Sequence, residues 1–556
     1  MPELWVAILR RALAPLRVRW RRSAIYRQLL KGRLPDRIRY YPFDALPRRL
    51  EEADALLKGQ FRLAGEAVQI SAGSIFDRPT PGAAWAAALN GFEWLSPLSA
   101  AGGEAARDLA TQLISEWLER HGRYGEPAWS AEISARRLVQ IFAHGKFVIA
   151  NSDLLWRSKL FVSLRRQAAV LARVAGEASP GVPRIEAAVA TLLCCCCLGD
   201  EASRRQTALG ILEEEIEEQI MPDGGHVSRS PEELLLAFRQ IVMAADAVAV
   251  LGQPLPEWLR NAHDRMAPML RFFRHGDGGL ALFNGGTEGD ARMVAALLAR
   301  DEVHGQPFLH APYSGYHRLA AGRAHAVLDC GGPPPARFST RAHAACLAFE
   351  FGSGTHRIVV NCGAERDNAL RWRGALRATA AHSTVTLADT SMASILDRGW
   401  VRALVGPQLS AVGIPPQSGR METESGWNVE ASHGFYVPDF GIVHQRALCL
   451  SRRGTKLTGW DRLLPQSGRS CVGIPFAVRF HIHPDVRISP AQGGNILLKL
   501  PGGEGWRFRH GGPIVVEEST YVGQGSPRRA EQLVLTGAVD DRAAELAWVF
   551  EQIGAR

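Results

Sequence analysis

The spacing of apolar residues changes near residue 310, and this change constrains the fold more than any other feature of the chain. Between about residues 45 and 300, apolar residues recur every three or four positions, in segments such as "GEAARDLATQLISEWLERHG" and "SPEELLLAFRQIVMAADAVAVLG". This spacing predicts amphipathic helices. Gly, Pro or Asn separate the segments, so short loops are expected between them. Many helices of similar length on short loops favour paired helices that pack in layers.

Beyond about residue 310 the apolar runs become short and often alternate with polar residues, as in "HRIVVNCG", "HSTVTLAD" and "FAVRFHIHP". Gly, Pro and Asp punctuate them, which is typical of antiparallel sheets in a sandwich. We therefore predict an α+β multidomain chain. It has a basic N-terminal segment over residues 1–44, a helical domain over 45–305 and an antiparallel β-sandwich over 312–556.

The composition is that of a globular protein with an anionic partner. The chain has 556 residues, 46% of them hydrophobic, and a net charge of +9 to which the first fifty residues contribute much. A basic balance favours nucleic acid, anionic lipid or an acidic polysaccharide without choosing among them. Nucleic acid is not expected, because no recognisable nucleic-acid-binding module or interleaved aromatic pattern accompanies the charge.

No transmembrane segment is expected, since no apolar run approaches the roughly 20 residues that a spanning helix needs. The N-terminal "LWVAILRRALAPL" is interrupted too early for a signal-peptide core, so it is interpreted as a basic face packed on the body or a membrane-surface helix. The nine cysteines include "CCCC" at Cys194–Cys197. Adjacent cysteines on a helix point in different directions, so reduced thiols filling a buried helix are predicted.

Two loops carry candidate site residues in the helical half. In "MPDGGHVSRSPEE", a tight turn precedes an N-cap serine and a proline, which places His226 and Arg229 at a helix entry that favours an anion. The alternative is that His226 only packs in the loop. In "HGDGGLALFNGGTEGD", glycines allow close backbone approach to a ligand, and Asn284 and Glu288 share the loop. A plain structural connection is the alternative there.

A third group is made of histidines in the β half. His382 lies alone in "LRATAAHSTVTLAD", and His433, His444, His481 and His483 follow. Histidine with carboxylate is ordinary zinc chemistry, but the spacings are too irregular to define a site. The carboxylates available near these histidines are those of Asp389, Asp397 and Asp439.

Taken together, "RATAAHSTVTLAD", "HGFYVPDFGIVHQRALCLSRRGTKLTGWDRLL" and "FAVRFHIHPDVRIS" resemble the heparinase II/III-like family of polysaccharide lyases. The resemblance spans about residue 70 to the end and is most specific over residues 315–510. It implies an incomplete (α/α) toroid followed by an antiparallel β-sandwich, with a site in the cleft between them. It also implies β-elimination on uronate-containing glycans, in which the uronate carboxylate is neutralised, a base removes the C5 proton and an acid protonates the departing oxygen.

The resemblance also implies residue roles. His226 and His382 match catalytic positions, with Arg229 beside His226 to neutralise charge. A structural zinc ion is implied at His382 and His433, with Asp397 or Asp389 as its carboxylate ligand. The family's catalytic tyrosine has no counterpart, because no tyrosine falls between Tyr124 and Tyr313. Tyr316 is the candidate to take its place, with Tyr436, or acid and base duties shared by His226 and His382, as the alternatives. The candidate substrate-binding residues are Arg229, Asn284, Arg377 and Tyr436.

The sequence thus predicts a polysaccharide lyase that cleaves an acidic, uronate-containing glycan. The alternative is a non-catalytic protein on the same scaffold that binds acidic glycan or assists envelope polysaccharide assembly. The resemblance favours the cell envelope or periplasm, whereas the missing export signal and the reduced thiols favour the cytoplasm. Besides zinc, no cofactor is expected. The identity of the glycan and the oligomeric state are not predicted.

Overall fold

The computed structural model describes residues 12–30, 34–45, 49–199, 202–301, 307–365, 370–396, 399–466, 471–540 and 543–554, with the single residues 8, 32 and 305. The chain divides into two compact units. The first, called here the helical unit, contains residues 1–219 and 236–264. The second, the sheet unit, contains residues 220–235, 265–365 and 369–556. The loop of His226 and Arg229 therefore belongs to the sheet unit, although it comes from the helix-rich half of the sequence.

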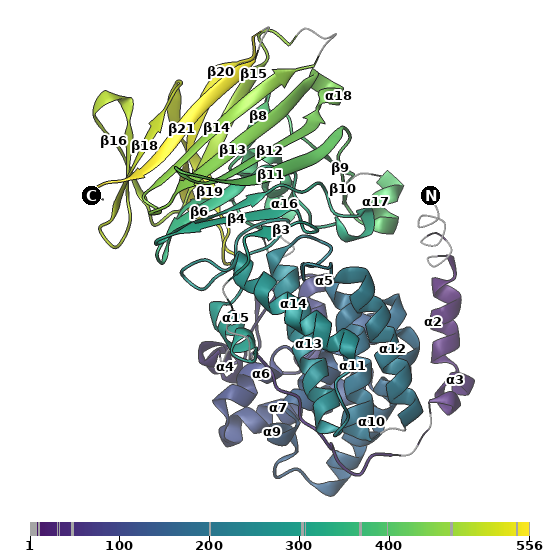
Figure 1. Cartoon of the computed structure of the whole chain (residues 1–556). Coiled ribbons are helices and arrows are strands. Elements are labelled where there is room, and N and C mark those ends of the chain that lie inside the picture. Colours follow the sequence, from purple (N-terminus) through teal and green to yellow (C-terminus); the bar gives the residue numbers. More distant parts are fainter. Residues whose placement is uncertain are drawn as a thin grey trace. The chain divides into compact units, whose positions relative to one another are not determined.

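The helical unit is built from helices joined by short connections, as the sequence pattern predicts (Figure 1). Helix α8 packs against α10 and α11, and α11 packs against α12, so neighbouring helices form layers. A two-stranded hairpin of β1 (Gln60–Leu63) and β2 (Glu66–Gln69) follows α4. The helices that lie wholly in this unit are α2 (Ala14–Arg22), α3 (Ala24–Leu29), α4 (Leu50–Leu57), α5 (Ala83–Asn90), α6 (Leu95–Ala101), α7 (Gly103–His121), α8 (Ala131–Ala143), α9 (Gly145–Ile149), α10 (Leu154–Val174), α11 (Val182–Leu198) and α12 (Ala202–Gln219).

Local sequence signals explain where these helices begin and end. The Asp153 side chain caps α10 by accepting a hydrogen bond from the Trp156 amide at 2.8 Å. Helix α11 ends at Gly199, which has a φ of 74° and closes the last turn with its amide on the Cys195 carbonyl. All four cysteines of Cys194–Cys197 are buried in α11, as the sequence predicts, and no disulfide links any two cysteines.

Helices α13 (Pro231–Val250) and α14 (Glu257–Phe273) each contribute residues to both units. The first turn of α13 and the last turns of α14 belong to the sheet unit. The same unit contains α15 (Ala291–Leu298), α16 (Leu370–Arg377), α17 (Gly399–Val405) and α18 (Val437–Phe440).

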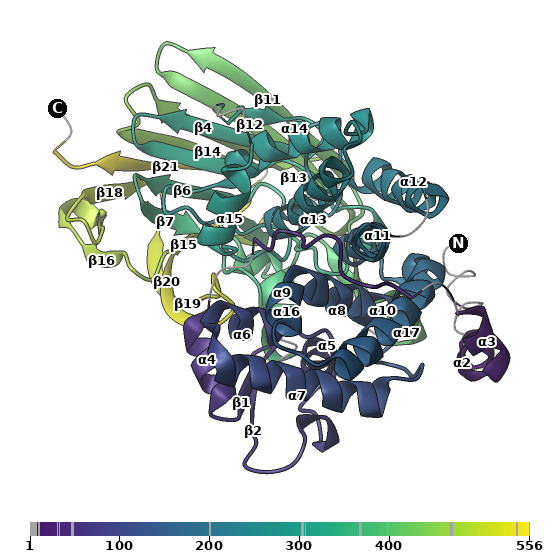
Figure 2. The same ribbon diagram turned by 90° about the horizontal axis from the view of Figure 1, so that it is seen from below.

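The sheet unit contains two large antiparallel sheets (Figures 1 and 2). The first has the order β11-β12-β13-β14-β21-β18-β17-β16. The second has the order β19-β20-β15-β7-β6-β5-β4-β3, with β8 also paired to β15. Strands β9 (Ser394–Leu396) and β10 (Gln408–Ser410) form a separate pair. The first large sheet consists of β11 (Ile414–Thr423), β12 (Gly426–Tyr436), β13 (Ile442–Ser451), β14 (Lys456–Pro465), β16 (Arg487–Pro490), β17 (Ile496–Lys499), β18 (Gly505–His510) and β21 (Ala544–Gln552). The second consists of β3 (His310–Ala311), β4 (Tyr316–Ala321), β5 (Ala324–Asp329), β6 (Phe349–Ser353), β7 (His356–Val360), β8 (Val385–Leu387), β15 (Pro475–Ile482), β19 (Ile514–Tyr521) and β20 (Arg528–Ala538).

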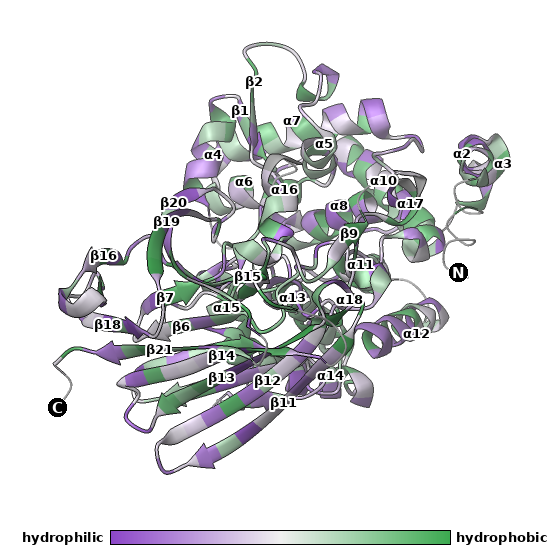
Figure 3. Ribbon diagram, turned by 90° about the horizontal axis from the view of Figure 1, so that it is seen from above, coloured by the Kyte–Doolittle hydropathy of each residue, from purple (hydrophilic) through white to green (hydrophobic). Residues whose placement is uncertain are grey.

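The two sheets enclose one apolar core, which makes them a sandwich. Phe349 of β6 stacks on Trp548 of β21 with a centroid separation of 5.4 Å, and Phe480 of β15 packs edge-on against the same indole. Along β14, buried and half-buried residues alternate, so one face of the strand meets the core. Colouring by hydropathy shows hydrophilic and hydrophobic residues mixed along the outer strands β11 and β12 (Figure 3). The predicted helical half followed by an antiparallel sandwich is confirmed.

No helix within the described residues is both long enough and apolar enough to cross a membrane.

Candidate active site in the sheet unit

The loop before α13 is held by its own backbone and side chains. The Arg229 amide donates to the His226 carbonyl at 2.8 Å, and Nδ1 of His226 lies 2.7 Å from the Ser228 hydroxyl. His226 is only 1% exposed, and burial lowers its pKa. Its imidazole is therefore neutral and contacts a residue of its own loop. This favours the alternative in which His226 only packs in the loop.

Arg229 turns into the interior of the sheet unit, where it is paired with Asp329 at the end of β5. The backbone of Arg229 has a φ of 60°, a left-handed conformation that directs the side chain away from the helix that follows. Nε of Arg229 donates to the Ser314 carbonyl at 2.8 Å, and a terminal nitrogen donates to the Gly332 carbonyl at 2.6 Å. The charge of Arg229 is thus balanced inside the protein and is not offered to a substrate.

Tyr316 and Asn284 extend this network. The Tyr316 hydroxyl donates to the Arg229 carbonyl at 2.8 Å and accepts from the Asn284 side-chain amide at 2.9 Å. The Arg229 guanidinium also lies 4.8 Å from the Tyr316 ring centroid. Tyr316 is fully buried, and burial together with the Asp329 charge raises its pKa well above the usual range. A hydroxyl with two internal partners and a raised pKa is poorly suited to proton transfer.

His382 is joined to this network through a histidine that sequence reasoning missed, His343. The Asn284 side-chain oxygen accepts from the His343 amide at 3.4 Å, and Nδ1 of His343 lies 2.9 Å from Nε2 of His382. The other ring nitrogen of His382, Nδ1, lies 2.9 Å from the Ala378 carbonyl. Burial lowers the pKa of His382 to about 4 and that of His343 well below its usual value. Both rings are neutral at pH 7.

Two arginines of α16 hold the segment that carries His343. The Arg377 guanidinium donates to the Ala342 carbonyl at 2.8 Å and to the Ser339 carbonyl at 3.1 Å, and its side chain is 3% exposed. Arg373 donates to the Thr340 carbonyl at 3.3 Å. Arg377 was predicted to bind substrate. In these contacts Arg377 holds the backbone that carries His343 in place. Contact of Arg377 with a substrate stays a prediction.

Positive charge gathers beside His343. Arg341 donates to the Gly285 carbonyl at 2.9 Å and has a side chain 39% exposed, with Glu232 at 3.6 Å as its acidic neighbour. Arg373 is half-buried, and its pKa is lowered by burial and by the charges of Arg341 and Arg402. Neighbouring guanidiniums of this kind repel one another, and a bound anion relieves that repulsion. The group of Arg341, Arg373 and Arg402 is called here the arginine rim.

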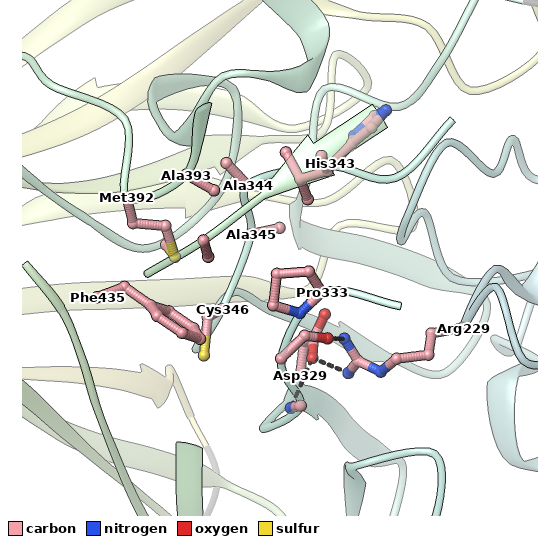
Figure 4. A pocket seen from close by; sticks show the side chains of 14 residues that line it. Arg229, Asp329, Pro333, His343, Ala344, Ala345, Cys346, Met392, Ala393 and Phe435 are labelled. Atoms are coloured by element: carbon pink, nitrogen blue, oxygen red, sulfur yellow. Dashed lines mark hydrogen bonds and ion pairs between the residues drawn. The ribbon is translucent and has the colours of Figure 1, made fainter. Parts of the chain in front are cut away.

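A small pocket lies beside the Arg229–Asp329 pair, and His343 also lines it. Its interior has room for about one water molecule, far less than the usual small-molecule site offers. Figure 4 shows Arg229 and Asp329 facing each other at one end, while the His343 imidazole points away from Cys346 and Phe435. The pocket has room for a small group rather than a sugar chain. The remaining lining residues are Gly331, Gly332, Pro333, Ala344, Ala345, Met392, Ala393, Leu409 and Ala411.

The two predicted zinc ligands that the structure describes, His382 and His433, have protein partners at their ring nitrogens. Both imidazole nitrogens of His382 are engaged, as described above. Nε2 of His433 lies 3.3 Å from Nδ1 of His444, and Nδ1 of His433 accepts from the Phe435 amide at 3.2 Å. The third predicted ligand, Asp397, lies outside the described residues. Within the described part of the chain, no group of three or more His, Cys, Asp or Glu side chains could hold a metal ion.

His433 and Tyr436 instead belong to the interior of the sandwich. His444 connects His433 to Asp461, which also accepts two hydrogen bonds from Arg446 and one from the Trp548 indole at 3.0 Å. Tyr436 is fully buried and donates to the Val385 carbonyl at 2.9 Å. Substrate binding by Tyr436 stays a prediction, which these contacts do not favour.

The structure therefore brings Arg229, Asn284, Tyr316 and His382 into one hydrogen-bonded network, all within the sheet unit, with His226 on the adjoining loop. Two members were missed. Asp329 ends the apolar run "AHAVLDCG", and an acid in such a run signals a buried cationic partner. His343 lies in "RAHAACLAFEFG", where no pattern distinguishes it, because its role comes from a partner 39 positions away.

Comparison with known proteins agrees with this architecture. Residues 304–549 match the family described as "Heparinase II/III-like, C-terminal". The FtsZ-localized protein C of Caulobacter vibrioides is 31% identical over 558 residues, covering 98% of this chain and 95% of that protein. Among solved structures, heparinase III superposes with a TM-score of 0.72 at 14% identity, covering 100% of this chain and 92% of that one. A heparan sulfate lyase HepC mutant from Pedobacter heparinus has a TM-score of 0.62 at 15% identity, covering 95% and 87%.

These solved structures show the fold, an incomplete (α/α) toroid followed by an antiparallel β-sandwich. The relative from Caulobacter, which is similar along almost its whole length, shows the family. The chain belongs to the heparinase II/III-like family.

Proposed function

We propose that this chain binds an acidic polysaccharide at the arginine rim and cleaves uronate-containing chains by β-elimination. The observation that carries the proposal is the position of His343, a neutral imidazole close to the positive charges of Arg341 and Arg377. β-Elimination needs both kinds of group in one place. A cation must neutralise the uronate carboxylate, and a neutral base must accept the C5 proton.

The arginine rim supplies the first of these groups. Guanidinium pairs with carboxylate or sulfate through two parallel hydrogen bonds, which suits a polyanionic sugar chain. Arg229 is excluded from this part because Asp329 balances its charge in the interior. Arg341 is the best candidate, since its side chain is 39% exposed and it lies two positions before His343 in the sequence.

The proposal is tested with the purified full-length chain on heparan sulfate, hyaluronan and alginate. Elimination creates an unsaturated uronosyl end, so ultraviolet absorbance should rise with time on at least one of these glycans. In parallel, the salt concentration that elutes the protein from an immobilised polyanion should fall for Arg341→Ala and for Arg373→Ala. Loss of a charge-assisted hydrogen bond, worth about 1.5–3 kcal/mol, corresponds to affinity about tenfold or more weaker.

Arg462→Ala is the matched control. It removes one positive charge from an exposed pair with Glu545, between β14 and β21 of the first large sheet, so it should elute as the unmodified chain does. Absence of product on every glycan contradicts cleavage. Equal elution of all three arginine variants contradicts binding at the arginine rim.

A second candidate function is suggested by the full-length relative, which is named as an FtsZ-localized protein. In this proposal the chain accumulates with FtsZ at the division site and its sheet unit binds glycan without turnover. The nine cysteines form no disulfide with one another, which supports a reducing compartment and hence the cytoplasmic side of the membrane.

A fluorescent fusion of the full chain distinguishes the candidates when it is imaged with labelled FtsZ and assayed for lyase product. Midcell signal without product supports the second function alone. Product without midcell signal supports the first alone and contradicts division-site localisation.

A further inference from the structure

Three buried side chains of the sheet unit form a hydrogen-bonded chain that the candidate site does not use. Nε2 of His275 lies 2.8 Å from a carboxyl oxygen of Glu350 on β6, and Nδ1 of the same ring lies 2.7 Å from Nε2 of His325 on β5. Glu350 is 0% exposed, His275 4% and His325 7%, so exposure rises along the chain toward His325. Solvent therefore reaches this chain most easily at the His325 end.

The chain has two complete arrangements of its protons. A neutral imidazole has one N–H group and one lone pair, so His275 donates at one end and accepts at the other. When Glu350 is ionised, it accepts from Nε2–H of His275, and Nδ1 of His275 accepts from Nε2–H of His325. When Glu350 is protonated, it donates to Nε2 of His275, and Nδ1–H of His275 donates to Nε2 of His325. Both arrangements keep both hydrogen bonds, and they differ by one proton.

The neighbouring charges place that proton on the carboxyl group. Arg357 of β7 donates to Asp277 with Nε at 2.7 Å and Nη2 at 3.2 Å, whereas it lies 3.8 Å from Glu350. Burial lowers the pKa of both histidines well below the usual value and raises the pKa of Glu350 to about 7. The charged and titratable groups that face the chain are Arg318 of β4, Arg357, Asp277, His483 after β15 and Tyr521 of β19.

The other oxygen of Glu350 holds the segment that leads to Asn284. It accepts from the Leu282 amide at 3.2 Å and from the Asn361 amide at 3.1 Å. The Asn361 side chain donates to the Leu282 carbonyl at 3.2 Å, so both backbone polar groups of Leu282 are bound to this part of the sheet unit. Asn284, two residues later, donates to the Tyr316 hydroxyl at 2.9 Å. The charge of Glu350 therefore acts on a segment that ends in the candidate site.

We propose that Glu350, His275 and His325 form a proton switch that takes up one proton from solvent at His325 and delivers one to Glu350. The proton from water or a buffer acid binds Nδ1 of His325, and the Nε2 proton of His325 moves to Nδ1 of His275. The Nε2 proton of His275 then moves to the carboxyl group. Once Glu350 is protonated, the Leu282 amide is bound to a neutral oxygen instead of a carboxylate, which weakens that hydrogen bond. The switch does not depend on the lyase function proposed above.

The experiment follows the full chain, labelled with nitrogen-15 in histidine and leucine, by NMR between pH 8 and pH 6. On acidification, the proton of both His275 and His325 should move from Nε2 to Nδ1 with one shared midpoint near pH 7. The Leu282 amide proton should move to higher field with the same midpoint, because its acceptor loses its charge.

Glu350→Gln copies the protonated state, since the amide oxygen accepts from both backbone amides while the NH₂ group donates to His275. In this variant both rings should stay protonated at Nδ1 at every pH, and the Leu282 signal should not move. Glu545→Gln is the control, because it removes an exposed carboxylate of β21 and should titrate as the unmodified chain does.

Three outcomes overturn the inference. They are separate midpoints for the two rings, a doubly protonated His275 ring at pH 6, and a switch that persists in Glu350→Gln. The first two are decided on the unmodified chain, so they hold even where Glu350→Gln does not fold. Absence of lyase product changes none of these measurements.

Discussion

The guanidinium of Arg229 forms an ion pair with the carboxylate of Asp329 in the interior of the sheet unit, where the side chains are 8% and 2% exposed. The pair ties the loop before α13 to the end of β5, positions that are 100 residues apart in the sequence. Burial alone would raise the pKa of Asp329, and the Arg229 charge opposes that effect. Arg229, a candidate ligand-binding residue in the sequence, is therefore committed to Asp329, which the sequence analysis did not single out.

Replacement of Asp329 by Ala should destabilise the chain by about 3–5 kcal/mol, because Arg229 would keep a buried charge without a partner. Chemical unfolding followed by fluorescence measures the loss. Glu545→Ala is the control, since it breaks an exposed pair with Arg462 and should cost about 1 kcal/mol or less. Equal losses for the two variants would contradict a balanced buried pair.

Tyr316→Phe should lower the free energy of unfolding by about 1–3 kcal/mol, because the Arg229 carbonyl and the Asn284 amide would both lose a buried partner. Lyase activity should stay within a few-fold, since the hydroxyl is occupied. Tyr313→Phe is the control, because its side chain is exposed. A hundredfold loss of activity at unchanged stability would instead give Tyr316 the catalytic role predicted from the sequence.

The chain should lose stability as the pH falls from about 6.5 to about 4. The pKa of His382 is about 4 in the folded chain and that of an unfolded histidine is about 6.5, so unfolding takes up a proton between these values. This histidine alone contributes about 3 kcal/mol that is present above pH 6.5 and lost at pH 4. The pKa values of other buried histidines are lowered in the same direction, namely those of His226, His275, His325, His343, His433, His444 and His481.

Buried acids act in the opposite sense in this range, since burial raises the pKa of Asp329 as well as that of Glu350. Burial raises the pKa of Glu350 to about 7, so its contribution to stability grows as the pH falls below 7. Since the histidines outnumber these acids, urea midpoints measured from pH 8 to pH 4 should decline with acidification. A midpoint that is constant or rises toward pH 5 would contradict neutral buried imidazoles.

Removal of metal ions by a chelator should leave the thermal midpoint of the chain unchanged. The nitrogens of His382 and His433 already have protein partners, so metal is not needed to satisfy them. Differential scanning calorimetry before and after chelation, with elemental analysis of the same sample, measures this. A fall in the midpoint that added zinc restores would revive the predicted zinc site and would involve Asp397.

The fold could be predicted from the sequence because its signals are local. The residues of helix α7 and strand β15 predict their own structure. Apolar residues recur with a period near 3.6 in α7 and near 2 in β15. The loop of His226 and Arg229 could not be assigned to the sheet unit in this way. Its membership depends on contacts of Arg229 with Ser314 and Gly332, which no local pattern reveals.

The candidate site could be predicted only in part, for the same reason. Motifs pointed to Arg229, Asn284, Tyr316 and His382, and the structure places all four in one network. Whether each group faces a ligand or another protein group is decided by distant partners. Asp329 forms an ion pair with Arg229, and the carbonyls of Ser339 and Ala342 accept hydrogen bonds from Arg377. The imidazole of His343 lies within hydrogen-bond distance of His382.

The burial of the cysteine thiols has a practical consequence for spectroscopy. Cys449 of β13 is half-buried, whereas the other eight thiols are buried. Under native conditions a maleimide reagent should therefore modify one position first, on the outer part of the sandwich, without any engineered residue. A spin label or dye attached there would report distances and rotational motion in the unmodified sequence.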